Sequence, residues 1–167
     1  MDQTMLNDNS FVFPVYVYDY ILEKIVKLCK KFPKEVFGYL IGKILKWNDR
    51  LYVIIEDQLF IDSTVDSNQF STFQIEGTAG QYEKEFQKLK ILKNNDSLRV
   101  VGWWHSHPGF GCFLSKTDLH TQEFFFPEIY QVALVVDPIK DEFQFFTLDD
   151  KLETKYKTIS YAIISSE

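Results

Sequence analysis

The chain has 167 residues, 46% hydrophobic and 25% charged, an ordinary composition for a soluble globular protein of one domain. Its net charge of −6 and the lack of a basic cluster exclude a protein that mainly binds nucleic-acid phosphates. The polar N-terminus lacks the features of a signal peptide, and no apolar run approaches the ~18 residues of a membrane helix. We expect a single domain over residues 1–167, located in the cytoplasm and without a membrane or nucleic-acid partner.

The first predicted elements are a strand and a helix. Residues 11–17 (FVFPVYV) are aromatic and β-branched, which predicts a strand that Pro14 would confine to a sheet edge. Apolar residues at helical spacing follow, and predict an amphipathic helix that Asp19 can cap and that ends before Pro33. Cys29 lies on the apolar stripe of this helix, so we expect it to be a small core residue.

A hairpin is predicted next. Residues 35–46 and 51–60 are rich in apolar and β-branched side chains, and Asn48-Asp49 between them is typical of a tight turn. Gly38 and Gly42 lie within the first of these strands. They indicate a bulge or a close approach of another chain segment.

A polar segment separates the hairpin from a second helix. Residues 61–75 are rich in Ser, Thr, Asp and Asn, yet they carry apolar side chains such as Val65 and Phe70. Long irregular segments inside a domain are usually functional. Apolar residues at helical spacing then predict a helix over 79–94.

The C-terminal half alternates strands with one further helix. Residues 98–104 predict a buried strand, and a third helix is expected from Ser115 onwards. Shorter strands are predicted over 131–136, 142–147 and 158–164. This interspersed order favours an α/β or α+β fold in which helices cover a mixed sheet.

The segment from residue 100 to residue 118 carries the strongest chemical signal. His105 and His107 follow an apolar strand, and side chains two residues apart in an extended segment point to the same side. Asp118 can reach the same point if residues 108–111 turn the chain back. Two imidazoles and one carboxylate leave a fourth position for water, which is the pattern of a catalytic zinc site. The sequence therefore predicts one Zn²⁺ per chain and a metal-dependent hydrolase.

Ser115 and Asp118 also have a structural interpretation. The pattern S-x-x-D before an apolar residue is typical of a capping box at the start of a helix. The two interpretations are compatible, because a residue in the first turn of a helix is rigidly held and can still point outwards. Trp103 and Trp104 alternate along the preceding strand, so we expect one in the core and the other beside a cleft.

Other hydrolase patterns fit less well. The chain has no H-E-x-x-H and no H-x-E with P-C-x-x-C, which excludes metzincin-type and nucleobase-deaminase motifs. A Ser-His-Asp triad is formally possible, but the G-x-S-x-G turn that usually carries such a serine is absent.

The spacing of these residues resembles the JAMM motif of MPN+ domain metalloproteases. That motif places seven residues between the second histidine of H-x-H-P and a serine, and two between the serine and an aspartate, as at His107, Ser115 and Asp118. A glutamate that opens an apolar, glycine-containing strand completes it, and Glu35 in EVFGYLIG matches that position. Residues 101–115 are similar to the eukaryotic branch that holds the proteasome-lid deubiquitinase and the COP9 signalosome deneddylase.

This resemblance implies an MPN domain, a curved mixed β-sheet flanked by helices in a layout like that of cytidine deaminases. It implies that zinc is held by His105, His107 and Asp118. Glu35 would be the general base, and Ser115 would donate a hydrogen bond to the tetrahedral oxyanion. The implied reaction removes ubiquitin or a ubiquitin-like modifier from a lysine side chain.

The same resemblance predicts how the substrate is held. Phe113 stands where close relatives have tryptophan, and would pack on the substrate tail. Val65 and Phe70 alternate within residues 62–75, which we expect to form a β-hairpin against the extended tail. The expected partners are ubiquitin or ubiquitin-like conjugates, and an MPN-domain partner or a proteasome-like complex. The short segment 149–156 leaves little room for the second insertion that embeds relatives in large assemblies.

Two alternatives remain open. A JAMM protease could process another substrate, such as the C-terminus of a sulfur-carrier protein or a peptide. An MPN domain could also serve as a scaffold without chemistry. Inert relatives normally lack one or more of the five motif residues, all of which are present here.

Overall fold

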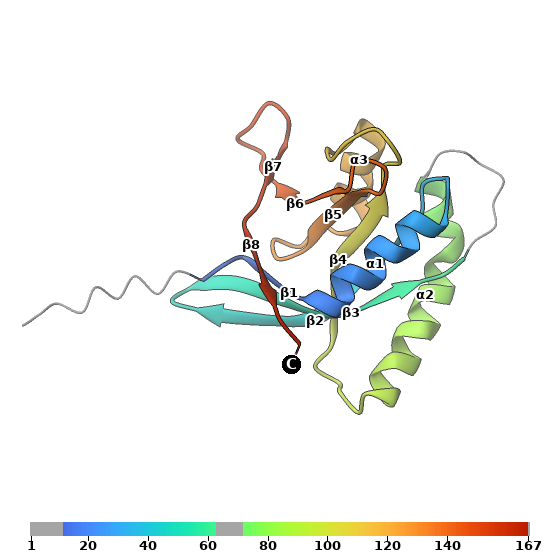
Figure 1. Cartoon of the computed structure of the whole chain (residues 1–167). Helices are drawn as coiled ribbons and strands as arrows, with labels where there is room; N and C mark the ends of the chain where they lie inside the picture. Colours follow the sequence, from blue (N-terminus) through green and yellow to red (C-terminus); the bar gives the residue numbers. More distant parts are fainter. Residues whose placement is uncertain (1–11, 63–71, 167) are drawn as a thin grey trace, which may run out of the picture.

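The computed structural model describes residues 12–62 and 72–166 of the chain. Its centre is a mixed sheet with the strand order β7-β6-β5-β4-β2-β3-β1-β8. The strands are β1 (Val15–Tyr18), β2 (Phe37–Trp47), β3 (Arg50–Phe60), β4 (Arg99–Ser106), β5 (Val132–Asp137), β6 (Glu142–Leu148), β7 (Tyr156–Thr158) and β8 (Tyr161–Ile164). The helices are α1 (Asp19–Lys31), α2 (Thr72–Leu92) and α3 (Lys116–Phe125). The expected arrangement, a curved mixed sheet flanked by helices, is confirmed (Figure 1).

Different helices cover the two faces of the sheet. On one face, Ile25 of α1 shares an apolar cluster with Leu40 and Trp104. On the other face, Tyr82 of α2 lies in the cluster that contains Trp103. Both tryptophans are therefore fully buried, and the expectation that one of them lines a cleft is wrong.

The first strand lies inside the sheet rather than at its edge. β1 pairs in parallel with both β3 and β8. Pro14 precedes the strand, so its missing N–H removes no bond of the ladder, while its carbonyl accepts from Val53 N at 3.0 Å. The predicted edge position is therefore wrong. The prediction of a single strand over 158–164 is also wrong. Two strands cover this region, and β7 and β8 lie at opposite ends of the sheet.

The start of α1 differs from the sequence-based expectation. Tyr18 is the N-cap residue and makes no side-chain cap bond, so Asp19 does not cap the helix. Its carboxylate instead accepts from the backbone N–H of Ser166 at 3.1 Å and from the Ser166 hydroxyl at 2.7 Å. This contact ties the end of the chain to the start of α1. Cys29 is fully buried on the apolar stripe, as expected.

The predicted hairpin is confirmed. Asn48 and Asp49 have positive φ angles of 45° and 63°, the conformation that a two-residue turn between twisted strands requires. Gly38 marks a close approach, because a Cβ there would meet the Trp104 indole and the Leu59 carbonyl. The strand register shifts at Gly42, as the glycine pattern indicated.

The second helix begins earlier than predicted. α2 starts at Thr72, so the segment expected to be extended through Ile75 is helical at its end. Val65 and Phe70 lie outside the described residues. In α3, Phe124 points outwards and is 64% exposed, whereas Phe126 after the helix is buried. No helix in the described parts of the chain is both long and apolar enough to cross a membrane.

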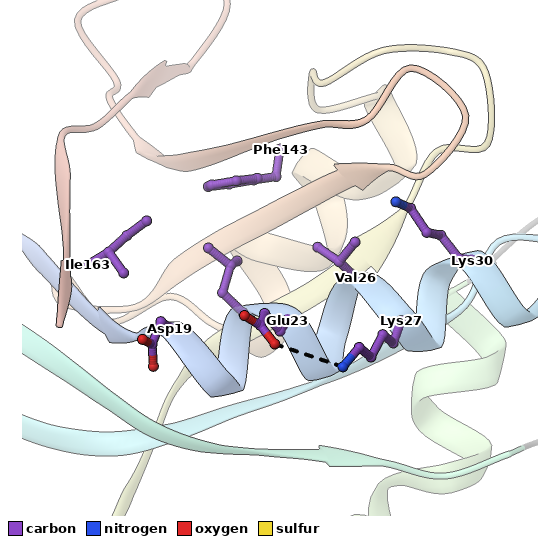
Figure 2. Close-up of a pocket in the computed structure, with 8 residues that line it drawn as sticks. Asp19, Glu23, Val26, Lys27, Lys30, Phe143 and Ile163 are labelled. Carbon is purple, nitrogen blue, oxygen red and sulfur yellow. Dashed lines mark ion pairs between the residues drawn. The ribbon is translucent and has the colours of Figure 1, made fainter. Parts of the chain in front are cut away.

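An apolar groove of about 400 Å³ lies between α1 and strands β6 and β8. Figure 2 shows Val26, Phe143 and Ile163 lining it, with the exposed Glu23–Lys27 ion pair on the helix below. The groove is on the α1 side of the sheet. Of the predicted site residues that the structure describes, none lines it.

Candidate metal centre

The two histidines come together at the end of β4. His105 is in the strand and His107 lies one residue beyond it, so their side chains leave the chain in the same direction. Their Nε2 atoms are 3.1 Å apart. Both imidazoles are buried, with 0% and 3% of the residue exposed. The pairing expected from the i, i+2 spacing is confirmed.

Asp118 completes the cluster from the first turn of α3. Its Oδ1 lies 3.3 Å from His105 Nε2 and its Oδ2 lies 3.2 Å from His107 Nε2. Ligand atoms about 2.0–2.2 Å from a tetrahedral zinc are about 3.3–3.6 Å apart, close to these distances. Two nitrogens and one carboxylate oxygen also match the donors of catalytic zinc sites. The three residues therefore fit a zinc ion, with one ligand position left open.

Helix capping holds Asp118 in place. Ser115 is the N-cap of α3, and its Oγ accepts from the Asp118 N–H at 3.2 Å. The Ser115 N–H donates to Asp118 Oδ2 at 2.7 Å. The predicted capping box is confirmed. The cap uses a lone pair of Ser115 Oγ and leaves its hydroxyl hydrogen to donate, and the Ser115 side chain also bonds the Asp118 carboxylate.

The charges in the cluster support one another. Burial alone would raise the pKa of Asp118, but the adjacent His105, His107 and Ser115 hold that pKa well below its usual range. Burial lowers the pKa of His107, and the hydrogen bond and charge of Asp118 outweigh this and raise it overall. Asp118 is therefore an anion at neutral pH, as a metal ligand must be.

Glu35 reaches the cluster through strand pairing. β2 and β4 are antiparallel, and beyond their paired ends Val36 N donates to Ser106 Oγ at 3.0 Å while Ser106 N donates to Val36 O at 2.9 Å. Continuing this register by one residue places Glu35 opposite His107. In agreement, the charge of Glu35 contributes to the raised pKa of His107. The strand register and this charge effect thus place Glu35, the predicted base, near His107, one of the candidate ligands.

Phe113 also lies beside the cluster. Its ring centroid is 4.9 Å from that of His107, and the residue is 41% exposed. An apolar side chain next to a metal ligand and open to solvent can contact a substrate.

Sequence reasoning missed Gln122, which supports His105 through the ring of Trp103. The Trp103 ring stacks on His105 with a centroid distance of 4.3 Å, and Trp103 Nε1 donates to Gln122 Oε1 at 2.6 Å. Gln122 is fully buried in α3, and its Nε2 donates to the carbonyls of Phe126 and Gln131. A lone glutamine in a helix carries no sequence signal for such a role.

Replacing Gln122 with leucine should destabilise the protein by about 3 kcal/mol, because buried polar groups lose their partners while the volume is kept. Urea denaturation of the metal-free protein would measure this. Gln87→Leu is a matched control, since the exposed Gln87 side chain donates to the exposed Glu83 on the surface of α2, and its loss should change stability by less than about 0.5 kcal/mol. Equal effects of the two changes would contradict the structural role of Gln122.

Asp137 is the second residue that was missed, since D-P after a strand indicates only a strand end. Burial would raise the pKa of its carboxyl, but backbone N–H groups of Lys140, Gly109, Gly111 and Ile139 bind the anion and lower the pKa to about 2. A carboxyl with a lowered pKa contributes stability above its unfolded value and loses it as the pH falls through the folded value. The stability difference between the wild type and Asp137→Asn should therefore be constant above about pH 5 and shrink towards pH 2. Urea titrations at several pH values in chelator would show this, and a difference unchanged at pH 2 would contradict it.

Comparisons with known proteins agree with this geometry. The family model described as JAB1/Mov34/MPN/PAD-1 ubiquitin protease matches residues 11–129, which include the three candidate ligands. COP9 signalosome complex subunit 5 of Candida albicans is 37% identical over 112 residues, covering 64% of this chain and 17% of that protein. Ubiquitin carboxyl-terminal hydrolase RPN11 of Saccharomyces cerevisiae is 31% identical over 128 residues, covering 75% of this chain and 39% of that protein.

The matched region is therefore less than two fifths of the length of these relatives. A solution structure of protein DSY2949 from Desulfitobacterium hafniense is similar in fold, with a TM-score of 0.61 and 18% identity. The similar region covers 92% of this chain and 93% of the DSY2949 chain. At this identity the likeness concerns the fold alone.

Proposed function

Because the chain belongs to the JAB1/Mov34/MPN/PAD-1 family, we propose that it is a zinc-dependent isopeptidase that releases ubiquitin or a ubiquitin-like modifier from lysine side chains. The observation that carries this proposal is the buried cluster of His105, His107 and Asp118 with Glu35 beside it. A scaffold without chemistry would have no need for all these groups at one point.

The chemistry follows from the positions of the residues. A zinc ion held by the cluster would act as a Lewis acid and lower the pKa of a coordinated water to about 7. Glu35 accepts the proton that the attacking water releases, and then delivers it to the departing lysine amine. Ser115 donates its hydroxyl hydrogen to the oxygen that becomes negative as the carbonyl carbon turns tetrahedral. Phe113 packs on the extended tail that leads to the scissile bond.

Binding of partners follows from the same proposal. The substrate is a protein modifier whose flexible C-terminal tail enters the centre beside Phe113. Val65 and Phe70, which lie outside the described residues, are proposed to contact that tail. The relatives named as subunits of the COP9 signalosome and of the 26S proteasome support membership of a similar assembly.

A panel of purified conjugates tests this function. Lysine-linked ubiquitin and ubiquitin-like conjugates, a linear modifier fusion and an unrelated peptide would be incubated with the zinc-loaded protein and with chelator-treated protein. We expect about one zinc per chain by elemental analysis, and cleavage of a lysine conjugate that stops with chelator and returns with zinc. Cleavage of the linear fusion or the peptide alone would favour the processing protease. A folded, zinc-loaded protein that cleaves nothing would overturn the enzymatic proposal.

A further inference from the structure

We propose that Asp137 is a positioning residue of the metal centre, which holds the turn after His107 so that the Gly111 carbonyl orients the His107 imidazole towards the metal. This inference rests on the metal centre of the proposed function, but not on the identity of the substrate. Asp137 is the last residue of β5, and its side-chain hydrogen bonds go to backbone N–H groups of two turns and not to the three candidate ligands.

The Asp137 carboxylate is completely buried and is used entirely by backbone N–H groups. Its Oδ1 accepts from Gly109 at 2.9 Å and from Ile139 and Lys140 at 3.0 Å each. Its Oδ2 accepts from Gly111 at 2.7 Å. One side chain thus joins two turns, the turn that follows the histidines and the turn between β5 and β6.

The turn after the histidines carries one bond of its own, from Phe110 N to His107 O at 3.1 Å, and is otherwise held from outside. Gly109 and Gly111 have φ angles of +83° and +82°, so this segment cannot continue the strand or form a regular helix. His107 N still bonds to Val136 O at 2.8 Å, which is the last such link before the chain leaves the sheet. The N–H groups of both glycines then bind Asp137. The carboxylate therefore holds the N–H side of Gly111, whose φ of +82° turns the chain before its own carbonyl.

The carbonyl of Gly111, in the following peptide unit, in turn sets the tautomer of His107. Gly111 O lies 3.1 Å from His107 Nδ1, and a carbonyl oxygen can only accept. The neutral imidazole must therefore carry its hydrogen on Nδ1, which leaves the lone pair of Nε2 facing Asp118 and His105. A carbonyl behind a metal-ligating histidine fixes the tautomer and the ring orientation.

Asp137→Asn should affect the hydrogen bonds of the two turns differently. The amide oxygen can take the place of Oδ1 and keep the bonds from Gly109, Ile139 and Lys140. The amide NH₂ must then take the place of Oδ2, where it faces the Gly111 N–H as a second donor. The variant should therefore release Gly111 while the turn between β5 and β6 stays bonded.

The expected result is weaker metal binding in a folded protein. Competition with a chromophoric chelator should show zinc affinity lowered about 10- to 100-fold in Asp137→Asn. Thermal melting should show a smaller gain on adding zinc than in the wild type, whereas a purely structural loss would lower the melting temperature equally with zinc and with chelator. Asp141→Asn is the matched control: it removes the same charge in the neighbouring turn, from an exposed residue at φ 58°, which asparagine tolerates. Its zinc affinity should equal that of the wild type.

The tautomer of His107 can be measured directly in the wild-type protein. Two-bond ¹H–¹⁵N correlation spectra of the zinc-loaded protein should show His107 with its hydrogen on Nδ1 and none on Nε2. The opposite tautomer would overturn the proposal, as would wild-type zinc affinity in Asp137→Asn or an equal loss in Asp141→Asn. All these measurements are independent of activity. Absence of isopeptidase activity would therefore reject the proposed function, whereas the role of Asp137 would still be tested by zinc affinity.

Discussion

Glu35→Gln should slow cleavage of a conjugate by about 10²- to 10⁴-fold while zinc stays bound. Glutamine has the size and shape of glutamate but cannot accept the proton of the attacking water. Glu35 reaches the centre through two hydrogen bonds between Val36 and Ser106, one backbone and one to the Ser106 hydroxyl, which the substitution does not touch. Steady-state cleavage and the zinc content of the same sample would be measured together.

The control for this change is Glu123→Gln, an exposed glutamate of α3 that loses the same charge away from the centre. It should leave both the rate and the zinc content unchanged. Loss of zinc from Glu35→Gln would place Glu35 among the metal ligands. An unchanged rate would remove it from the chemistry altogether.

Ser115→Ala should slow cleavage by about 10²- to 10³-fold, because the hydrogen-bond donor to the oxyanion is removed. The same change removes the side-chain cap of α3, which costs about 1 kcal/mol of stability. The backbone N–H of Ser115 still donates to Asp118 Oδ2, so zinc should remain bound. Kinetics, urea denaturation and elemental analysis would separate these three effects.

Ser115→Asn distinguishes capping from chemistry. Asparagine is as good an N-cap residue as serine, but its amide does not reproduce the hydroxyl. We expect Ser115→Asn to recover the stability and not the rate. If its rate equalled that of the wild type, capping of α3 would be the only role of Ser115.

Much of the metal centre is visible in the sequence because its parts are close along the chain. His105 and His107 share one extended segment, whose alternation alone directs both imidazoles to the same side. Ser115 and Asp118 share one helix start, where the three-residue spacing alone sets the capping box. The hairpin at Asn48-Asp49 and the buried stripe of α1 are local patterns of the same kind.

The position of Glu35 is different in kind. As a residue at the mouth of a strand it carries no chemical signal, and only the resemblance to the JAMM motif assigned it a role. The structure brings it to His107 through the register of β2 against β4, a pairing between segments some 70 residues apart that no local pattern specifies.

The composition, the local periodicity and the short motif spacings of this chain thus indicate most of its strands, its three helices and the three candidate metal ligands. The tertiary structure alone decides that β1 lies inside the sheet, that both Trp103 and Trp104 are buried, and that Asp137 binds the turn behind His107. The reason is physical. Backbone geometry relates residues within a few positions of each other, whereas burial and long-range hydrogen bonds depend on which strands become neighbours and which helices cover them.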